Sequence, residues 1–146
     1  MNIFERWQHR LSNTQVIGDG TWPLPYMLRW EILRFLGMTV KVHVFMKSDR
    51  DCHHDHPWSF LTLVVGGRYV EEILNEDGTT KQVTRKPMTI AYRKAEHKHR
   101  VLLIDEKPCL TIVLTFRRSR DWGFWSNGNF INWESFLQQK PSIRCE

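Results

Sequence analysis

One stretch of the sequence decides the fold, SDRDCHHDHPWSFLTLVVGG at residues 48–67. It joins a cluster of histidines to a run of apolar and β-branched residues that ends at the glycine pair Gly66-Gly67. Such a run, bounded by turn formers, is typical of a buried strand, and the glycine pair predicts a tight hairpin. Residues i and i+2 of an extended segment project to the same side, so His54 and His56 can offer two imidazoles to one ion.

Further runs rich in β-branched and aromatic residues flank this stretch. Turn formers at 75–78 and 105–108 separate some of them. Many short strands with no helix between them predict an antiparallel sandwich or barrel. The expected strands cover residues 39–46, 60–65, 69–74, 82–84, 89–92, 99–104 and 109–116.

Helices are expected only near the two ends of the sequence. Apolar residues at helical spacing predict a short helix over 3–11 and a second, packed helix over 26–36. Near the other end, the aromatic segment 122–125 is expected to plug the domain. A short helix capped by Asn132 should follow it.

The composition is that of one globular domain. A chain of 146 residues with 41% hydrophobic residues can bury a real core but is short for two domains. We predict a single domain, 1–146, divided into a helical segment (1–37), a barrel (38–118) and an aromatic segment (119–146). No apolar stretch is long enough to span a membrane, and the first residues lack the features of a signal peptide. A cytoplasmic protein with three free cysteines is therefore expected.

A second histidine cluster, His97-Lys98-His99, begins another expected strand. If this strand lines the same barrel, His99 completes a three-histidine metal site that leaves positions open for water or substrate. His97 lies on the same strand face as His99, so it is an alternative ligand or a base that contacts the substrate. His43 is expected at the surface or at the rim of the barrel.

The first histidine stretch resembles the first motif of the cupin superfamily. That motif has a glycine, five residues, His-x-His, three or four residues, a glutamate, six residues and a glycine. Ser48, His54-Asp55-His56, Phe60 and Gly67 fit this register. Phe60 stands where the family has a metal-binding glutamate, so any metal is held by histidines alone or by a replacement donor. The second motif of the family is matched only around His99.

The resemblance covers residues 40–116 and implies a mostly β fold. This fold is the cupin-like double-stranded β-helix, a jelly-roll barrel, here with N-terminal helices and a short C-terminal helix. It also implies a divalent transition metal at His54, His56 and His99. Iron would suit a dioxygenase-type oxidoreductase, and zinc or manganese an isomerase. We expect a small-molecule metalloenzyme that forms a homodimer.

A competing ligand register exists in the same stretch. His53-x-Asp55, together with His99, resembles the facial triad of iron- and 2-oxoglutarate-dependent oxygenases, a related fold. In that interpretation Arg117 or Arg118 would bind the carboxylate of the cosubstrate. The two registers turn opposite strand faces inward and both faces are largely apolar, so periodicity leaves the choice open. The cupin spacing and the short chain favour His54 and His56.

The net charge of +5 is concentrated in one region. Residues 81–120 contain 11 basic and 3 acidic residues, whereas 37–80 contain 4 basic and 7 acidic ones. Cations at the mouth of a barrel would attract a carboxylate or phosphate substrate. The alternatives are a solvated basic surface balanced by Glu71 and Glu72, or a surface that binds nucleic acid, for which no recognised motif is present.

The expected pocket combines these groups. Trp58 and Phe60 share a strand face with His54 and His56 and are expected to line it. Arg100 and Arg117 would bind the substrate, and the expected catalytic residues are His97 and Arg93. The other interpretations are a histidine network without metal, and a non-catalytic protein that binds a small ligand or nucleic acid on the same fold.

Overall fold

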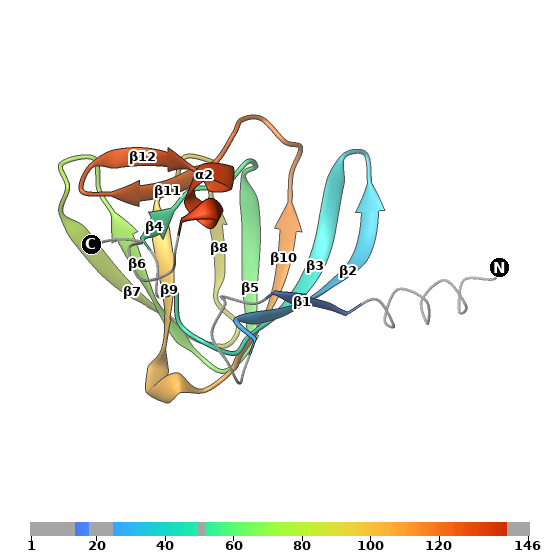
Figure 1. Ribbon diagram of the computed structural model, residues 1–146. Coiled ribbons are helices and arrows are strands. Elements are labelled where there is room, and N and C mark those ends of the chain that lie inside the picture. Colours follow the sequence, from blue (N-terminus) through green and yellow to red (C-terminus); the bar gives the residue numbers. More distant parts are fainter. Residues whose placement is uncertain (1–13, 18–24, 50–51, 140–146) are drawn as a thin grey trace.

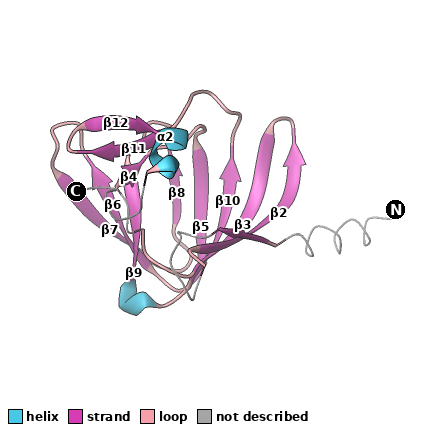
Figure 2. Cartoon of the chain, in the orientation of Figure 1, coloured by secondary structure: helices cyan, strands magenta, loops and turns pink. Residues whose placement is uncertain are grey.

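The structure is a computed structural model that describes residues 14–17, 25–49 and 52–139. Most of this chain forms two six-stranded antiparallel sheets (Figures 1 and 2). The strand order is β1-β2-β3-β10-β5-β8 in the first, here called sheet A. In the second, sheet B, the order is β12-β11-β4-β9-β6-β7.

Each sheet combines strands that are distant in the sequence. Sheet A contains β1 (Gln15–Ile17), β2 (Met27–Phe35), β3 (Met38–Phe45), β5 (Phe60–Gly66), β8 (Ile90–Arg93) and β10 (Cys109–Thr115). Sheet B contains β4 (His53–His54), β6 (Tyr69–Leu74), β7 (Thr80–Arg85), β9 (His99–Leu103), β11 (Gly123–Ser126) and β12 (Asn129–Asn132). A short 3-10 helix, η1 (Ile104–Glu106), and a short α-helix, α2 (Trp133–Gln138), complete the described elements.

The inward faces of the two sheets form the core. On β10 the odd-numbered residues are buried and the even-numbered ones lie outside, as the alternation of a strand requires. Val64 of sheet A packs with Tyr69, Val101 and Leu103 of sheet B, and with Cys109. The mostly β prediction is therefore confirmed, but the described strands form two sheets and not a closed barrel.

The helix predicted over 26–36 is wrong, because this segment is β2. Its many apolar residues fit a helix as well as a strand. A turn at Leu36-Gly37, where both residues have positive φ, reverses the chain so that β3 pairs with β2 in a hairpin. The helix predicted over 3–11 lies outside the described residues. The C-terminal helix is confirmed, and its cap is the predicted one, since Asn132 accepts a hydrogen bond from Glu134 N at 2.9 Å.

The glycine pair Gly66-Gly67 does not form the predicted hairpin, because β5 and β6 belong to different sheets. Gly67 has a φ of 76°, and a Cβ there would lie 2.6 Å from the carbonyl oxygen of Pro108. Only glycine fits this crossing. The predicted turn at 75–78 does join the hairpin of β6 and β7. The aromatic segment 122–125 contributes to β11, which pairs with β4 beside the histidines.

The inward face of sheet A is unusually polar. On β3 the inward residues Lys41 and His43 are each only 9% exposed, so the prediction that His43 lies at the surface is wrong. The outer face of the same sheet carries the apolar residues Val40, Val42, Val44, Leu61, Leu63, Ile90, Tyr92, Leu110, Ile112 and Leu114. Polar side chains therefore lie between the sheets, where a binding site can use them.

Two expectations concern the whole chain. None of the helices described here is long and apolar enough to cross a membrane. Cys52 is disulfide-bonded, so the expectation of three free cysteines is wrong. Cys109 is a free and fully buried thiol, and burial raises its pKa to about 11. It packs in the core.

Candidate metal centre

Three imidazoles converge between the sheets, those of His54, His56 and His99, called here the three-histidine group. β4 pairs with β9 so that His54 lies opposite His99, and His56 follows two residues later. The ring centroids lie 5.0, 5.1 and 5.2 Å apart, and one ligand atom of each ring lies within 4.8 Å of the others. His56 Nε2 and His99 Nε2 are 3.0 Å apart. Two nitrogens, each about 2.1 Å from one ion, have this separation at a right angle.

A buried glutamate orients one of these rings. Glu71 of β6 is 0% exposed, and its Oε1 accepts a hydrogen bond from His99 Nδ1 at 2.7 Å. Because Nδ1 carries the proton, the Nε2 lone pair of His99 points toward His56, which is the tautomer that a metal ligand needs. Of the alternatives for the basic stretch, the one in which Glu71 balances a solvated basic surface is therefore wrong for this residue.

Four donors hold the Glu71 carboxylate. Arg93 donates to both oxygens, Arg85 Nε donates to Oε2 at 2.7 Å, and His97 Nε2 lies 3.0 Å from Oε1, beside His99. Burial alone would raise the pKa of Glu71, but the hydrogen bonds from His97, His99 and Arg93 outweigh it and hold this pKa well below its ordinary value. Glu71 is therefore a fixed buried anion.

Burial keeps two of the three imidazoles neutral. Burial, reinforced by the neighbouring His54 and His99, holds the pKa of His56 well below its ordinary value. Burial lowers the pKa of His99 to about 3, although the hydrogen bond to Glu71 acts in the opposite direction. Neutral imidazole is the metal-binding form, so protons do not compete with a cation for these two rings at neutral pH.

A second group of possible ligands, Glu71, His97 and His99, shares one histidine with the first. A divalent ion there would lie beside the guanidinium groups of Arg85 and Arg93, which already bind Glu71. Repulsion between like charges disfavours that arrangement. The three-histidine group offers three imidazole donors instead and is the better metal site.

The two aromatic residues predicted for the pocket lie in different places. Phe60 is 6% exposed, and its ring centroid lies 4.6 Å from that of His56 and 6.1 Å from that of His99. It covers the three-histidine group with apolar surface. Trp58 lies between β4 and β5, and its ring faces Nζ of Lys41, a residue of the inward face of sheet A, at 4.5 Å.

The predicted basic pocket residues are mostly engaged elsewhere. Arg100 lies on the opposite face of β9 from His99 and pairs with Glu72 at 2.7 Å. Arg117 is exposed and donates to a backbone carbonyl in the turn between β2 and β3 at 2.9 Å. Arg93 is buried in its ion pair with Glu71. The structure therefore brings neither Arg100 nor Arg117 to the three-histidine group.

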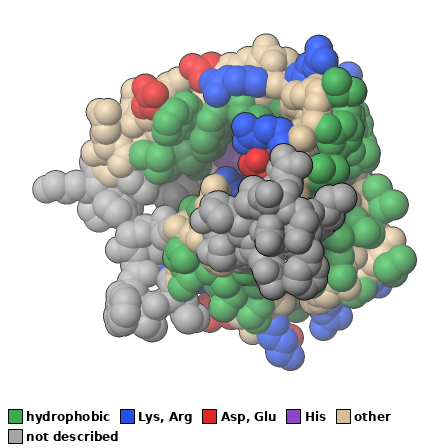
Figure 3. All heavy atoms as spheres, turned by 90° about the vertical axis from the view of Figure 1, so that its right-hand side faces the viewer, with side chains coloured by type: hydrophobic (Ala, Val, Ile, Leu, Met, Phe, Trp, Pro, Cys, Tyr) green, Lys and Arg blue, Asp and Glu red, His purple; other side chains and the backbone are tan. Residues whose placement is uncertain are grey.

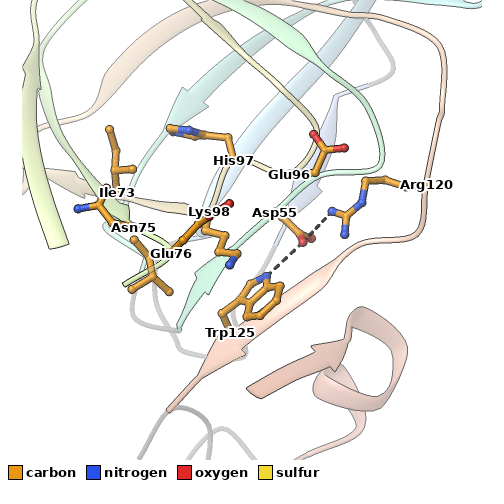
Figure 4. A pocket seen from close by; sticks show the side chains of 10 residues that line it. Asp55, Ile73, Asn75, Glu76, Glu96, His97, Lys98, Arg120 and Trp125 are labelled. Carbon is orange, nitrogen blue, oxygen red and sulfur yellow. Dashed lines mark hydrogen bonds and ion pairs between the residues drawn. The ribbon is translucent and has the colours of Figure 1, made fainter. Parts of the chain in front are cut away.

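Asp55, a ligand in the competing register, has other partners. Its carboxylate is fully buried and accepts hydrogen bonds from Gly123 N at 2.8 Å and Trp125 Nε1 at 3.1 Å. Arg120 Nη1 lies 2.7 Å from the same group, as Figure 4 shows. Asp55 therefore ties the histidine segment to β11.

His53, which the competing register pairs with Asp55 as a ligand, contacts the carboxylate of Glu72. Its Nε2 lies 3.0 Å from Glu72 Oε1. Among the described residues, the groups that could hold a metal include neither His53 nor Asp55. The structure does not bring these two residues together with His99.

His97, predicted to be catalytic, lines a pocket of about 450 Å³ near the end of β6 and the start of β9. Figure 4 shows it with Lys98 and Trp125, two other residues of the lining. Because His97 also contacts Glu71, it connects this pocket to the carboxylate that orients His99.

No protein-family model and no curated protein matches the sequence. Solved structures do match the fold. A cupin-2 domain protein from Rhodospirillum rubrum has a TM-score of 0.63 at 7% identity, covering 79% of this chain and 76% of its own. Hydroxypropylphosphonic acid epoxidase from S. wedmorenis has a TM-score of 0.57 at 10% identity, covering 72% of this chain. A structure reported with the DMSP lyases RdDddP and RnDddQII has a TM-score of 0.53 at 19% identity, covering 67%.

The match extends over 56% of the epoxidase chain and 52% of the chain in the lyase study. At identities of 7–19%, likeness of this kind shows a shared fold and leaves activity open. The pairing of two antiparallel sheets and the histidines at the start of β4 and β9 agree with it. The chain therefore has a cupin-like fold.

Proposed function

We propose that this chain is a metal-dependent enzyme that acts on a small anionic molecule. In this proposal His54, His56 and His99 bind a divalent transition metal. The observation that carries it is the convergence of three imidazoles, one of them held by Glu71 in the tautomer of a metal ligand. Three protein ligands leave coordination positions open, which is typical of catalytic rather than structural sites.

The residues present fit such a metal. Imidazole nitrogens suit iron, zinc and several other first-row ions. We propose Fe(II) first, because the chain resembles three-histidine cupin dioxygenases and because a structure of iron(II) epoxidase has the same fold. Zinc or manganese would favour an isomerase. When bound, the metal would supply Lewis acidity or, as iron, redox chemistry at an open position.

The residues of the chain have distinct roles in this proposal. Glu71 orients His99, and Phe60 keeps water away from the three-histidine group. Arg93 and His97 act as positioning residues, since both contact the Glu71 carboxylate and fix where its charge lies.

Metal analysis of protein purified without a histidine tag tests the proposal. We expect about one equivalent of a transition metal per chain. His54→Ala should abolish binding, whereas the matched variant His53→Ala should retain it, because His53 contacts Glu72 instead. Less than about a tenth of an equivalent, unchanged after reconstitution, would contradict the proposal.

The contacts of the basic stretch favour a small substrate over nucleic acid. Arg85 and Arg93 bind Glu71, and Arg100 binds Glu72, so these cations are not available to a phosphate backbone. We expect no shift of labelled oligonucleotides at moderate salt. A shift that weakens steeply as salt is added would favour a nucleic-acid-binding protein instead.

We also propose a homodimer formed through the outer face of sheet A. Val42, Ile112, Leu63 and Ile90 form one row across four strands, and Ile90 is 69% exposed. A two-fold contact would cover the same apolar patch on both copies. Light scattering should give twice the chain mass, and Ile112→Lys should reduce it. A wild-type protein that is monomeric at every concentration would contradict this.

A further inference from the structure

Two cations on the inward face of sheet A, the buried Lys41 and the half-buried Arg29, lack a carboxylate partner. Lys41 is 9% exposed, and its ammonium faces the ring of Trp58 at 4.5 Å. Within the described chain, the ammonium group of Lys41 has no hydrogen-bond acceptor and no ion-pair partner. Arg29 donates its Nε to His43 Nε2 at 3.2 Å, and this partner carries no negative charge. Charges that are removed from water are normally paired, so an anion beside Lys41 and Arg29 would be stabilising.

The carboxylate in the same part of the sheet, that of Glu31, already has a basic partner. Glu31 lies opposite Lys41 in the register of β2 and β3. Both of its oxygens accept hydrogen bonds from Arg34 at 3.0 Å. Burial, and next the charge of Arg29, lower the pKa of Lys41 to about 8. The environment of Lys41 thus opposes its charge in the absence of a further anion.

An unsatisfied hydroxyl lies in the neighbouring row. Arg29, His43 and Thr111 are cross-strand partners on β2, β3 and β10. Thr111 is 0% exposed, and its Oγ1 has no hydrogen-bond partner in the described chain. Burial and then Arg29 lower the pKa of His43 to about 3, so this ring is neutral and its Nδ1–H remains a donor. Buried hydroxyls without partners are rare, and an acceptor is what this row lacks.

These side chains face the same space between the sheets as the three-histidine group. The ring of His43 packs against Phe45 at 6.0 Å, and Phe45 packs against Tyr69 at 6.4 Å. The hydroxyl of Tyr69 accepts a hydrogen bond from Arg93, which binds Glu71. Figure 3 shows a recess on one side of the molecule where basic, acidic and histidine side chains lie behind a hydrophobic border.

We propose that Arg29, Lys41, His43 and Thr111 form an anion-binding subsite that holds a carboxylate or phosphate group of the substrate. The anion supplies the missing counter-charge to Arg29 and Lys41 and an acceptor for the Thr111 hydroxyl. The subsite rests on the proposed function, because it would bind the anionic end of the substrate while the metal at the three-histidine group would face the other end of the same molecule.

The test uses the full chain, stripped of metal with a chelator, and inorganic phosphate and acetate as probes at fixed ionic strength. We expect saturable binding in calorimetry and a rise in melting temperature with each probe. Lys41→Met should weaken phosphate binding at least about tenfold. Without phosphate, the same variant should melt at a higher temperature than the wild type, because it lacks an unpaired buried charge. A merely structural lysine would not show this opposite pair of effects.

Two further variants complete the test. Thr111→Val keeps the shape of the side chain and should also weaken phosphate binding, whereas Lys81→Met, at an exposed site on β7, should leave it unchanged. The subsite is overturned if the wild type binds neither probe, if Lys41→Met binds like the wild type, or if Lys81→Met loses as much affinity. Metal content is measured separately. Phosphate binding without any metal site would overturn the proposed function alone, and metal binding without anion binding would overturn the subsite alone.

Discussion

Glu71→Gln tests whether a buried carboxylate prepares the metal site. Glutamine keeps the length of the side chain and an oxygen that can accept from His99 Nδ1. It removes the negative charge that His97, His99, Arg85 and Arg93 share. The substitution therefore separates the charge of the carboxylate from its shape.

Two magnitudes follow from the contacts. Loss of the carboxylate behind a metal-binding histidine lowers metal affinity about 10- to 100-fold, or about 1.4–2.7 kcal/mol. Arg93, which is 3% exposed, loses its counter-ion, and leaving one partner of a buried pair alone costs about 3–5 kcal/mol of stability. The side chain of Arg85 is 22% exposed and can turn to water, so it adds little to this loss.

Zinc titration by competition with a chromophoric chelator measures the first effect, and urea unfolding the second. Glu72→Gln is the matched control, because this adjacent carboxylate pairs with Arg100 and His53 instead. It should leave zinc affinity unchanged. If Glu71→Gln is too unstable to titrate, adding Arg93→Met removes the unpaired charge, and the loss of affinity should persist. A folded Glu71→Gln protein that binds zinc as tightly as the wild type would refute the role of the carboxylate.

Three other substitutions have defined outcomes. Asp55→Asn should cost about 1.5–3 kcal/mol in urea unfolding, because the hydrogen bonds from Gly123 N and Trp125 Nε1 lose their charged acceptor, whereas the side chain of Arg120 is 29% exposed and can turn to water; metal stoichiometry should stay full, and loss of metal from the folded variant would favour the competing register. His43 has a folded-state pKa of about 3, against about 6.5 when unfolded, so its contribution to stability is present above pH 6.5 and is lost as the pH falls toward 3. His43→Gln should therefore lose about 2 kcal/mol less than the wild type between pH 7 and pH 5, and equal losses in urea unfolding would contradict the assignment. Gly67→Ala should cost about 2 kcal/mol or more of stability, because its Cβ meets a backbone oxygen, while Gly78→Ala, with open space around it, should cost only about 1 kcal/mol. Equal losses would show that the positive φ alone, and not the clash with the backbone oxygen, causes the loss at Gly67.

Most strands could be predicted where β-branched and aromatic runs end at turn formers. The strand predicted over 69–74 matches β6 from end to end, and that over 109–116 matches β10 to within one residue. The assignment of strands to two sheets could not be predicted. Phe60 pairs with Thr115, and the sequence around either residue does not indicate which residue it pairs with.

The errors cluster where polar residues face inward. On β3 the buried side is that of Lys41 and His43, and the outer side is that of Val40 and Val42. An interpretation that turns apolar residues inward therefore places His43 at the surface. Glu71 was missed for the same reason, and its alternation with Tyr69, a buried aromatic residue, was the available signal.

The ligand register illustrates another limit of the sequence. The spacing predicted that His54 and His56 lie together, and their ring centroids are 5.0 Å apart, but periodicity could not exclude Asp55 as a ligand. Its partners Gly123 and Trp125 lie on β11, 68 and 70 residues farther along the chain. Only the pairing of β4 with β11 shows that this carboxylate is already bound.

From the charges between the two sheets we expect the proposed metal and the proposed anion to bind cooperatively. Glu71 already has two guanidinium partners, while Arg29 and Lys41 have no carboxylate partner within the described chain. A divalent ion at the three-histidine group would add positive charge to an interior that is already positive, and an anion at the proposed subsite would relieve that repulsion. Metal-loaded protein should therefore bind acetate more tightly than metal-free protein, and acetate should tighten metal binding by the same factor. The gain should vanish in Lys41→Met, because without the subsite the anion loses its place in that interior. Equal acetate affinities with and without metal in the wild type would show that the two sites do not share one electrostatic environment.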